Sequence, residues 1–508
     1  MGRRSVKWIF WILLLGIVLT CIFHVDTLID GAVKKSVSFA VNAINAKKEL
    51  LVTINEVDMD AAKGIIYLRG INVVPDSPYY DNFKNDLTDK QMLTEFQIHE
   101  IALSNINLKT IFWDKRIDSA NISIKHFISN VYLSHRKDDA APSSSKSNTR
   151  FVDSLHLKGL DHIDLAKITV NRYQLNVLHA DTKDTISSIS GDYLEIDGVD
   201  LKERQNESQV FTLRTGNLAM YLKNQRLKLA NKDYEIALGS LEFNKAEQLL
   251  RLTDVKYSPV KSLEYLASKK KYADNLFDVQ FKNIAVDGLD IDAYQENHLV
   301  SINKIAVAGM DLKIFKNKQK PEYTSKRPLL PQQALETMGF PVHIDEIVLN
   351  NSSLTYKEVQ PGNAKEIMTV NLTNVNTQVR FVTSIKDSLA SGKPLTVALN
   401  SKLLGKTKMN IDITIPYNRR DNSFHYNGNI GSADLSMFNI LLIPSANIAI
   451  KTGRLERIHF SVKATPSRAD GELTMLYSNL YVDIPRKNKK VEHALSFLAS
   501  SAIHKLNP

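Results

Sequence analysis

The 508-residue chain has a single cysteine, and this scarcity excludes several kinds of site. Cys21 lies in an apolar N-terminal segment, so the rest of the chain can form neither a disulfide nor a thiolate metal site. The 13 histidines are scattered and include no His-Glu-x-x-His pair, which is the zinc spacing of many metalloproteases. A Gly-x-Ser-x-Gly nucleophile elbow is also missing. We therefore predict no metal, no cofactor and no catalytic residue, and a protein that is not an enzyme.

Two groups of residues resemble sites, but their sequence context argues against both. Gly405-Lys406-Thr407 looks like the end of a phosphate-binding loop, yet Asn400 stands where the first glycine belongs and a strand-like alternation follows. His156, His162 and Asp164 alternate with apolar residues, which indicates the solvated face of strands. Carboxylates are plentiful, and none stands out by context as a general acid or base.

The charge is spread thinly along the chain. The formal net charge is +10, and Arg3, Arg4 and Lys7 account for three of these charges ahead of the apolar segment. The remaining chain has no dense Lys/Arg stripe, so we predict no nucleic-acid partner. An anionic lipid surface is compatible with the mild excess of positive charge. The apolar fraction of 43% and the charged fraction of 24% are typical of a folded protein.

One long apolar run is present, at the N-terminus. Trp8–Val25 carries no charge over 18 residues, and a helix of this length spans about 27 Å, enough for a bilayer core. We predict a single transmembrane anchor in residues 1–25. The anchor residues are Trp8, Trp11, Leu14 and Ile17, with the tryptophans suited to the membrane interface.

The basic residues before the anchor predict an N-terminus in the cytoplasm and the remaining chain outside it. Lys34 and Lys35 follow the anchor and weaken this asymmetry. A cleaved signal peptide is a less favoured alternative, because no small-residue cleavage site follows the apolar run. A lipoprotein signal ending at Cys21 is another, but Thr20 stands where a small residue belongs.

From Leu51 onward, short apolar alternation predicts half-buried strands, and one spacing recurs. Apolar residues follow steps of two, three, two, three and two. Three copies are Phe96, Ile98, Ile101, Leu103, Ile106, Leu108; Val279, Phe281, Ile284, Val286, Leu289, Ile291; and Val300, Ile302, Ile305, Val307, Met310, Leu312, with partial copies starting at Leu194 and Val342. Residues two apart share one face of a strand, and the three-residue step indicates a bulge or a turn.

The turn is the favoured interpretation of the three-residue step. Asp287-Gly288 and Asp197-Gly198 are hairpin signals, and Ala308-Gly309 and Asn350-Asn351 occupy comparable places. The repeated unit is therefore predicted to be strand, tight turn, strand.

Helices are expected to be few. Apolar residues at helical spacing predict one helix over 27–50, and two more are expected over 259–275 and 331–338. The predicted divisions are 1–25 (anchor), 26–50 (capping or amphipathic helix), 51–430 (repetitive β-rich body), 431–490 (C-terminal region) and 491–508 (amphipathic tail). Residues 317–327 read as a charged connector within the body.

The C-terminal region has the most distinctive pattern. Residues 434–444 read as a short helix that ends before Pro444, and the ranges 448–460 and 469–482 each read as a strand pair. Gly453, Gly471 and the run Tyr477-x-x-Leu480-x-Val482 occur at the places they have in AsmA-like proteins of Gram-negative envelopes. About 75 residues resemble that family, and the basic run and apolar tail that follow resemble its Bacteroidota branch.

The resemblance implies a mainly β fold: a long, curled antiparallel sheet, or β-groove, with few short helices, anchored in the inner membrane. It also implies that the apolar concave face handles or transfers phospholipids for outer-membrane and envelope homeostasis. The groove lining would include Phe96, Ile98, Phe281, Val286, Ile302 and Val307. The implied partners are membrane phospholipids, the inner membrane and outer-membrane or other envelope proteins.

Two alternatives stay open on the sequence. The apolar residues could instead pack on one another in closed β-sandwich domains. The protein could also act as a structural or assembly factor for outer-membrane proteins, through its sheet edges and without lipid transfer.

Overall fold

The computed structural model describes residues 31–483, with gaps at 47, 61–62, 86, 88–91, 107–109, 111–113, 135–154, 157–160, 204–209, 215–217, 231, 323–328, 362, 386–387, 390 and 420. The predicted anchor, with Trp8, Trp11, Leu14 and Ile17, lies outside the described residues, as does the predicted tail at 491–508. Among the described residues no helix is both long enough and apolar enough to span a bilayer. The chain divides into two units, Met1–Leu250 and Arg251–Pro508.

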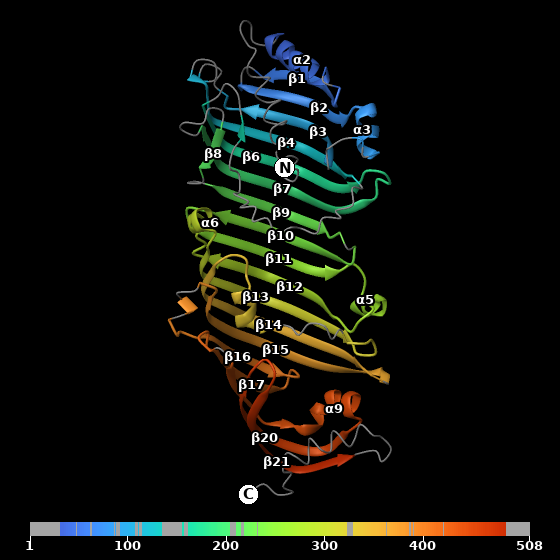
Figure 1. The fold of residues 1–508 in the computed structure, drawn as a ribbon, viewed down its shortest axis with the longest axis vertical. Helices are drawn as coiled ribbons and strands as arrows, with labels where there is room; N and C mark the ends of the chain where they lie inside the picture. Colours follow the sequence, from blue (N-terminus) through green and yellow to red (C-terminus); the bar gives the residue numbers. More distant parts are fainter. Residues whose placement is uncertain are drawn as a thin grey trace. The chain divides into compact units, whose positions relative to one another are not determined.

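The first unit is a mixed sheet that does not close (Figure 1). Its strands pair in the order β1, β2, β3, β4, β6, β7, β9, β10, and β8 bridges β7 to β5. The elements are α2 (Gly31–Asn45), β1 (Leu50–Asp60), β2 (Ile65–Pro75), α3 (Ser77–Lys84), β3 (Met92–Ser104), β4 (Arg116–Leu133), β5 (Leu155–His156), β6 (His162–His179), β7 (Thr185–Glu203), β8 (Val210–Arg214), β9 (Ala219–Lys228) and β10 (Tyr234–Asn244).

The second unit is built in the same way. The strands from β12 to β18 pair in sequence, followed by β20 and β21, and β19 pairs with β20. The elements are β11 (Leu249–Pro259, which begins just before the boundary), α5 (Leu263–Lys269), β12 (Asn275–Asp287), α6 (Ile291–Asn297), β13 (Val300–Asn317), α7 (Pro331–Glu336), β14 (Val342–Gln360), β15 (Asn363–Thr383), β16 (Leu395–Leu403), β17 (Thr407–Ile415), β18 (Phe424–Ile430), β19 (Ala433–Asp434), η1 (Leu435–Phe438), α9 (Asn439–Ala446), β20 (Ala449–Ala464) and β21 (Ala469–Asp483).

The prediction of a mainly β chain with few short helices is confirmed, but its sheet is mixed rather than antiparallel. β4 pairs with β6 in parallel, and β13 pairs with β14 in parallel. Parallel neighbours need a crossover between them, and helix α7 with its flanking loops supplies one between β13 and β14. Within each unit the described strands pair edge to edge in a single sheet, so the alternative of sandwich domains, which needs two packed sheets, is not what these residues form.

The three-residue steps of the repeat mark positions where the regular pairing of a strand is interrupted. These positions lie next to one another on successive strands and form a line across the sheet, and we call one such set of neighbouring positions a rung. In the first unit this rung, which we call seam 1, consists of Gly70, His99, His126, Arg172, Asp192 and Asn224, and four of them have positive φ (62° at Gly70, 50° at His126, 54° at Arg172 and 53° at Asn224). The pairs on either side stay in register: Arg69 lies opposite Glu100, and Ile71 lies opposite Ile98. Each strand gains one residue at the same rung, so no strand slips past its neighbour.

Seam 1 explains the three-residue steps between apolar residues of the repeat. A residue inserted into a strand shifts the alternation of side chains by one. Leu68 and Ile71 on β2 therefore share a face although they are three apart, and their partners Ile101 and Ile98 on β3 do the same. All four side chains are buried. Because bulges bend a strand, interruptions at one rung of successive strands bend the sheet along that line.

The second unit contains an equivalent line, seam 2. It consists of Lys282, Gly309, Asn351 and Asn374, of which the last three have φ of 68°, 49° and 50°. The prediction of tight turns is therefore wrong at Gly309 and Asn351, which lie inside continuous strands, and also at Gly198 inside β7. At Asp287-Gly288 β12 ends and a short helix, α6, follows instead of a paired strand. The bulge, the less favoured interpretation, is the correct one within the strands.

The C-terminal predictions need a similar correction. The ranges 448–460 and 469–482 are not strand pairs, because each forms part of one long strand, β20 or β21, and the two pair with each other. The helix expected over 434–444 is present as η1 and α9, but it continues through Pro444 to Ala446. Of the helices expected over 27–50, 259–275 and 331–338, the structure describes the shorter α2, α5 and α7.

Candidate functional site

Each sheet has one apolar face. In the second unit the alternation places Val279, Phe281, Ile284 and Val286 of β12 on the same face, and their cross-strand partners on β13 are also apolar. Those partners are Leu312, Met310, Val307 and Ile305. The parallel neighbour β14 continues the row with Ile344, Ile347, Leu349 and Leu354. We call this surface of β12 to β15 the apolar face of the second unit.

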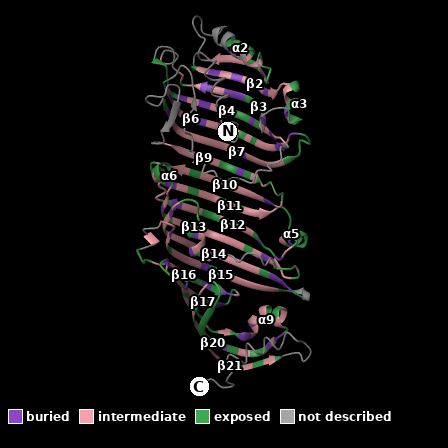
Figure 2. Cartoon of the chain, viewed as in Figure 1, coloured by how far each residue is buried: buried purple, intermediate pink, exposed green. Residues whose placement is uncertain are grey.

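The apolar face of the first unit is closed over its early strands. Figure 2 shows buried positions concentrated on β2, β3, β4 and β6. Helix α2 packs there, with Val37 buried in the same cluster and Val41 and Ile44 against it. The predicted lining residues Phe96 and Ile98 belong to this cluster and are each only 2% exposed. A ligand could not reach them in this structure, so their predicted contact with lipid is not supported here.

Later strands leave the apolar face more open. Residues of intermediate exposure dominate β10 and β11 in Figure 2. In the second unit Phe281, Met310 and Leu312 are half-buried, and Phe277 on the same face is 40% exposed. The predicted residues Val286, Ile302 and Val307 lie on this face as well, with 7–8% exposure. The structure therefore places four of the six predicted lining residues on one face, where Phe281 is half-buried and the other three are buried.

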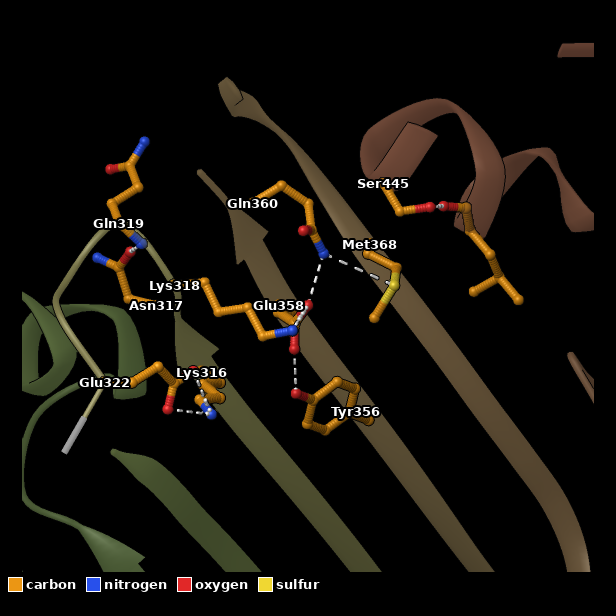
Figure 3. Close-up of polar contacts among 11 residues, drawn as sticks. Lys316, Asn317, Lys318, Gln319, Glu322, Tyr356, Glu358, Gln360, Met368 and Ser445 are labelled. Carbon is orange, nitrogen blue, oxygen red and sulfur yellow. Dashed lines mark hydrogen bonds and ion pairs between the residues drawn. The ribbon is translucent and has the colours of Figure 1, made fainter. Parts of the chain in front are cut away.

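A buried ionic cluster ends the apolar row on β14 (Figure 3). Tyr356, Glu358 and Gln360 continue the alternation of Leu354, so they face the same side. Glu358 is 3% exposed; its Oε1 lies 2.9 Å from Lys318 Nζ and accepts a hydrogen bond of 2.5 Å from Gln360 Nε2, and Tyr356 Oη donates to its other oxygen. Burial alone would raise the pKa of Glu358, but these contacts outweigh it and hold the pKa below the usual range.

The charge on Glu358 should make stability depend on pH. Its folded pKa is lowered, so its contribution is fully present above the unfolded pKa of about 4.3 and is lost as the pH falls through the folded value. We expect Glu358→Gln to destabilise the chain by about 1–3 kcal/mol at pH 7 and by much less at pH 3. Urea unfolding at both pH values measures this, with exposed Glu472→Gln as the control. An equal loss at both pH values would contradict this role.

Ion pairs cross the strands on the opposite face. Glu100 lies between Arg69 at 2.9 Å and Lys125 at 2.7 Å, and these contacts, led by Lys125, lower its pKa. In the second unit Glu346 lies 3.2 Å from Lys304, and its pKa is lowered mainly by the hydrogen bond from Gln378. Directly opposite pairs of unlike charge favour one strand register. The sequence alone did not reveal these pairs, because each joins residues that are more than 20 places apart.

The residues rejected as sites in the sequence lie on strands and turns. Gly405 and Lys406 form the turn between β16 and β17. His162 Nε2 lies 2.8 Å from Asp200 Oδ1 on the neighbouring strand, and Asp164 accepts hydrogen bonds from the backbone N–H and hydroxyl of Ser119. Within the described part of the chain, no three His, Cys, Asp or Glu side chains are grouped so as to hold a metal ion.

No protein-family model matches the chain, and no curated protein matches it. The geometry of the apolar face and its polar surroundings is therefore the basis for assigning a function.

Proposed function

We propose that the apolar face of the second unit binds the acyl chains of phospholipids. The observation that carries this proposal is an apolar sheet face on which Phe281, Met310 and Leu312 are only half-buried, with no second sheet over them in the described residues. A contiguous apolar surface of this kind marks a place where something else binds. A flexible hydrocarbon chain suits a long, narrow apolar strip, and each buried methylene contributes about 0.8 kcal/mol.

The wider role proposed is handling or transfer of phospholipids in a Gram-negative envelope. Trp8–Val25 would anchor the chain in the inner membrane with the sheet in the periplasm. The C-terminal resemblance to AsmA-like proteins supports the same role. In this proposal the protein performs no chemistry on the lipid.

Photo-crosslinking in membranes tests the proposal. A photoreactive phenylalanine analogue at Phe281 of the full chain should give a phospholipid adduct that mass spectrometry identifies. The matched position is Asn283, which lies two residues away and is exposed on the opposite face. Equal adducts at both positions, or none at Phe281, would argue against the apolar face as the lipid site.

A second candidate is a structural or assembly factor, and strand β21 is the feature that favours it. Among the described strands β21 pairs only with β20, and Leu473 and Tyr481 on it are 61% and 64% exposed. Its ten central residues, 473–482, carry no charge, although charges are a common protection of sheet edges. An extended segment of another envelope protein could add to this edge. Crosslinks from β21 to a protein, without any lipid adduct at Phe281, would favour this candidate.

A further inference from the structure

A row of polar side chains crosses four strands of the second unit on the face opposite the apolar one. Asp278 of β12 lies opposite Lys313 of β13, which lies beside Thr355 of β14, which in turn lies opposite Asn371 of β15. Neighbouring strands are about 4.8 Å apart, so the row is about 14 Å long. It offers a carboxylate, an ammonium group, a hydroxyl and an amide in succession.

The row forms the floor of a cavity of about 670 Å³. Helix α5 packs on β12 and β13, and the segment that leads into it forms the wall, with Ser258, Lys261 and Glu264 lining the space. Lys357 and Thr369, a cross-strand pair, extend the floor by one rung. All of these residues belong to the second unit.

The cations of this cavity are only partly neutralised. Lys313 Nζ lies 3.6 Å from both Asp278 and Asp311, and Asp278 also accepts a hydrogen bond of 2.8 Å from Ser258. Lys261 lies over the ring of Tyr265. Lys357 is exposed and forms no ion pair with another described residue. Two carboxylates, Asp278 and Asp311, therefore neutralise Lys313, whereas Lys261 and Lys357 form no ion pair with a described carboxylate and Glu264 is the other acidic residue of the lining.

We propose that this cavity binds an anionic oligosaccharide. Sugar hydroxyls need donors and acceptors close together, and the row supplies both from rung to rung. The spacing of about 4.8 Å between neighbouring strands is close to the length of one sugar ring, so successive rings of an oligosaccharide could each contact one strand. The lysines favour a carboxylate-bearing sugar over a neutral one. Pro259, Leu263, Ile314 and Phe315 also line the cavity, but a hydrocarbon chain would have to cover the charged and hydroxyl groups of its floor, which is costly. The site lies on the other face of the sheet and does not depend on lipid binding.

Calorimetric titration of the full chain in an uncharged detergent tests this proposal. We expect trigalacturonate to bind at low ionic strength, where charge contacts are least screened, and neutral cellotriose to bind at least about tenfold more weakly. Lys357→Ala should weaken trigalacturonate binding about tenfold. Lys408→Ala is the matched control, because Lys408 is also an exposed strand lysine of the second unit but lies outside the cavity, and it should leave the affinity unchanged.

Several results would overturn the proposal. They are no binding of trigalacturonate, equal binding of cellotriose, or an affinity that Lys357→Ala leaves unchanged. Inorganic phosphate that binds as tightly as trigalacturonate would show a simple anion site instead of a saccharide site. Thr369→Val removes one hydroxyl without changing charge, so a weaker trigalacturonate affinity in this variant would support the saccharide, and an unchanged one would count against it.

Discussion

Replacing Gly70 with alanine is expected to destabilise the chain by about 2–4 kcal/mol. Gly70 has a φ of 62°, a conformation that costs a residue with a Cβ atom about 1–2 kcal/mol. A Cβ there would also lie 2.9 Å from the Cβ of Asn55 on β1, so the two strands would have to move apart. Overpacking of this kind costs about 1–3 kcal/mol. The site lies on seam 1, beside the buried Ile71, where strand movement would disturb the buried core cluster of the first unit.

Gly64 provides the matched control for this prediction. It has nearly the same φ, 61°, in the turn between β1 and β2, but a Cβ there would meet nothing within 4 Å. Gly64→Ala should therefore cost only the conformational part, about 1–2 kcal/mol. Urea unfolding followed by circular dichroism of the strand signal measures both variants. Equal losses would show that close packing at seam 1 does not limit the substitution.

If the apolar face binds acyl chains as proposed, Phe281→Asp is expected to remove most of the phospholipid that copurifies with the chain. Phe281 lies on the apolar face opposite Met310, and both are half-buried. A carboxylate at this place would have to lose water when a hydrocarbon chain covers it, which costs several kcal/mol. We expect the amount of copurifying phospholipid to fall about tenfold or more. Mass spectrometry of lipids extracted from the full chain, purified in a mild detergent, measures the change.

Asn283→Asp adds the same charge two residues further along β12, on the exposed opposite face. It should leave the retained lipid unchanged. If both variants lost lipid equally, the added charge itself, and not its position on the apolar face, would explain the loss. If neither did, acyl chains would not bind at Phe281, and the edge of β21 would become the stronger candidate for function.

Much of this fold could be predicted from local patterns. Alternating apolar residues predicted the strands, and the repeated steps of two and three residues located the interruptions. The error at Gly198, Gly309 and Asn351 has a physical cause: glycine and asparagine tolerate positive φ equally well in a hairpin turn and in a bulge. Only the pairing of flanking residues with the next strand distinguishes these two cases, and that pairing is not a local property.

The candidate site, too, could be predicted from the sequence only in part. The pattern placed Phe281, Val286, Ile302 and Val307 on one face, since side chains two apart share a side of a strand. It could not show that Phe96 and Ile98, with the same spacing, are buried in the core cluster that also contains Val37 of α2. Burial depends on which side chains surround a residue, and this cluster combines residues of α2, β2, β3, β4 and β6, which are far apart along the chain.

The sequence by itself determined that this chain is mainly β, that one face of its strands is apolar and that its body can form no disulfide. The first two follow from the order of residue types along a strand, and the third follows from the single cysteine, Cys21. Only the tertiary structure decided that β4 and β6, and β13 and β14, pair in parallel, that the interruptions align in seams, and that Asp278, Lys313, Thr355 and Asn371 form one polar row. These features depend on register between strands, which is fixed by contacts between residues far apart in the chain.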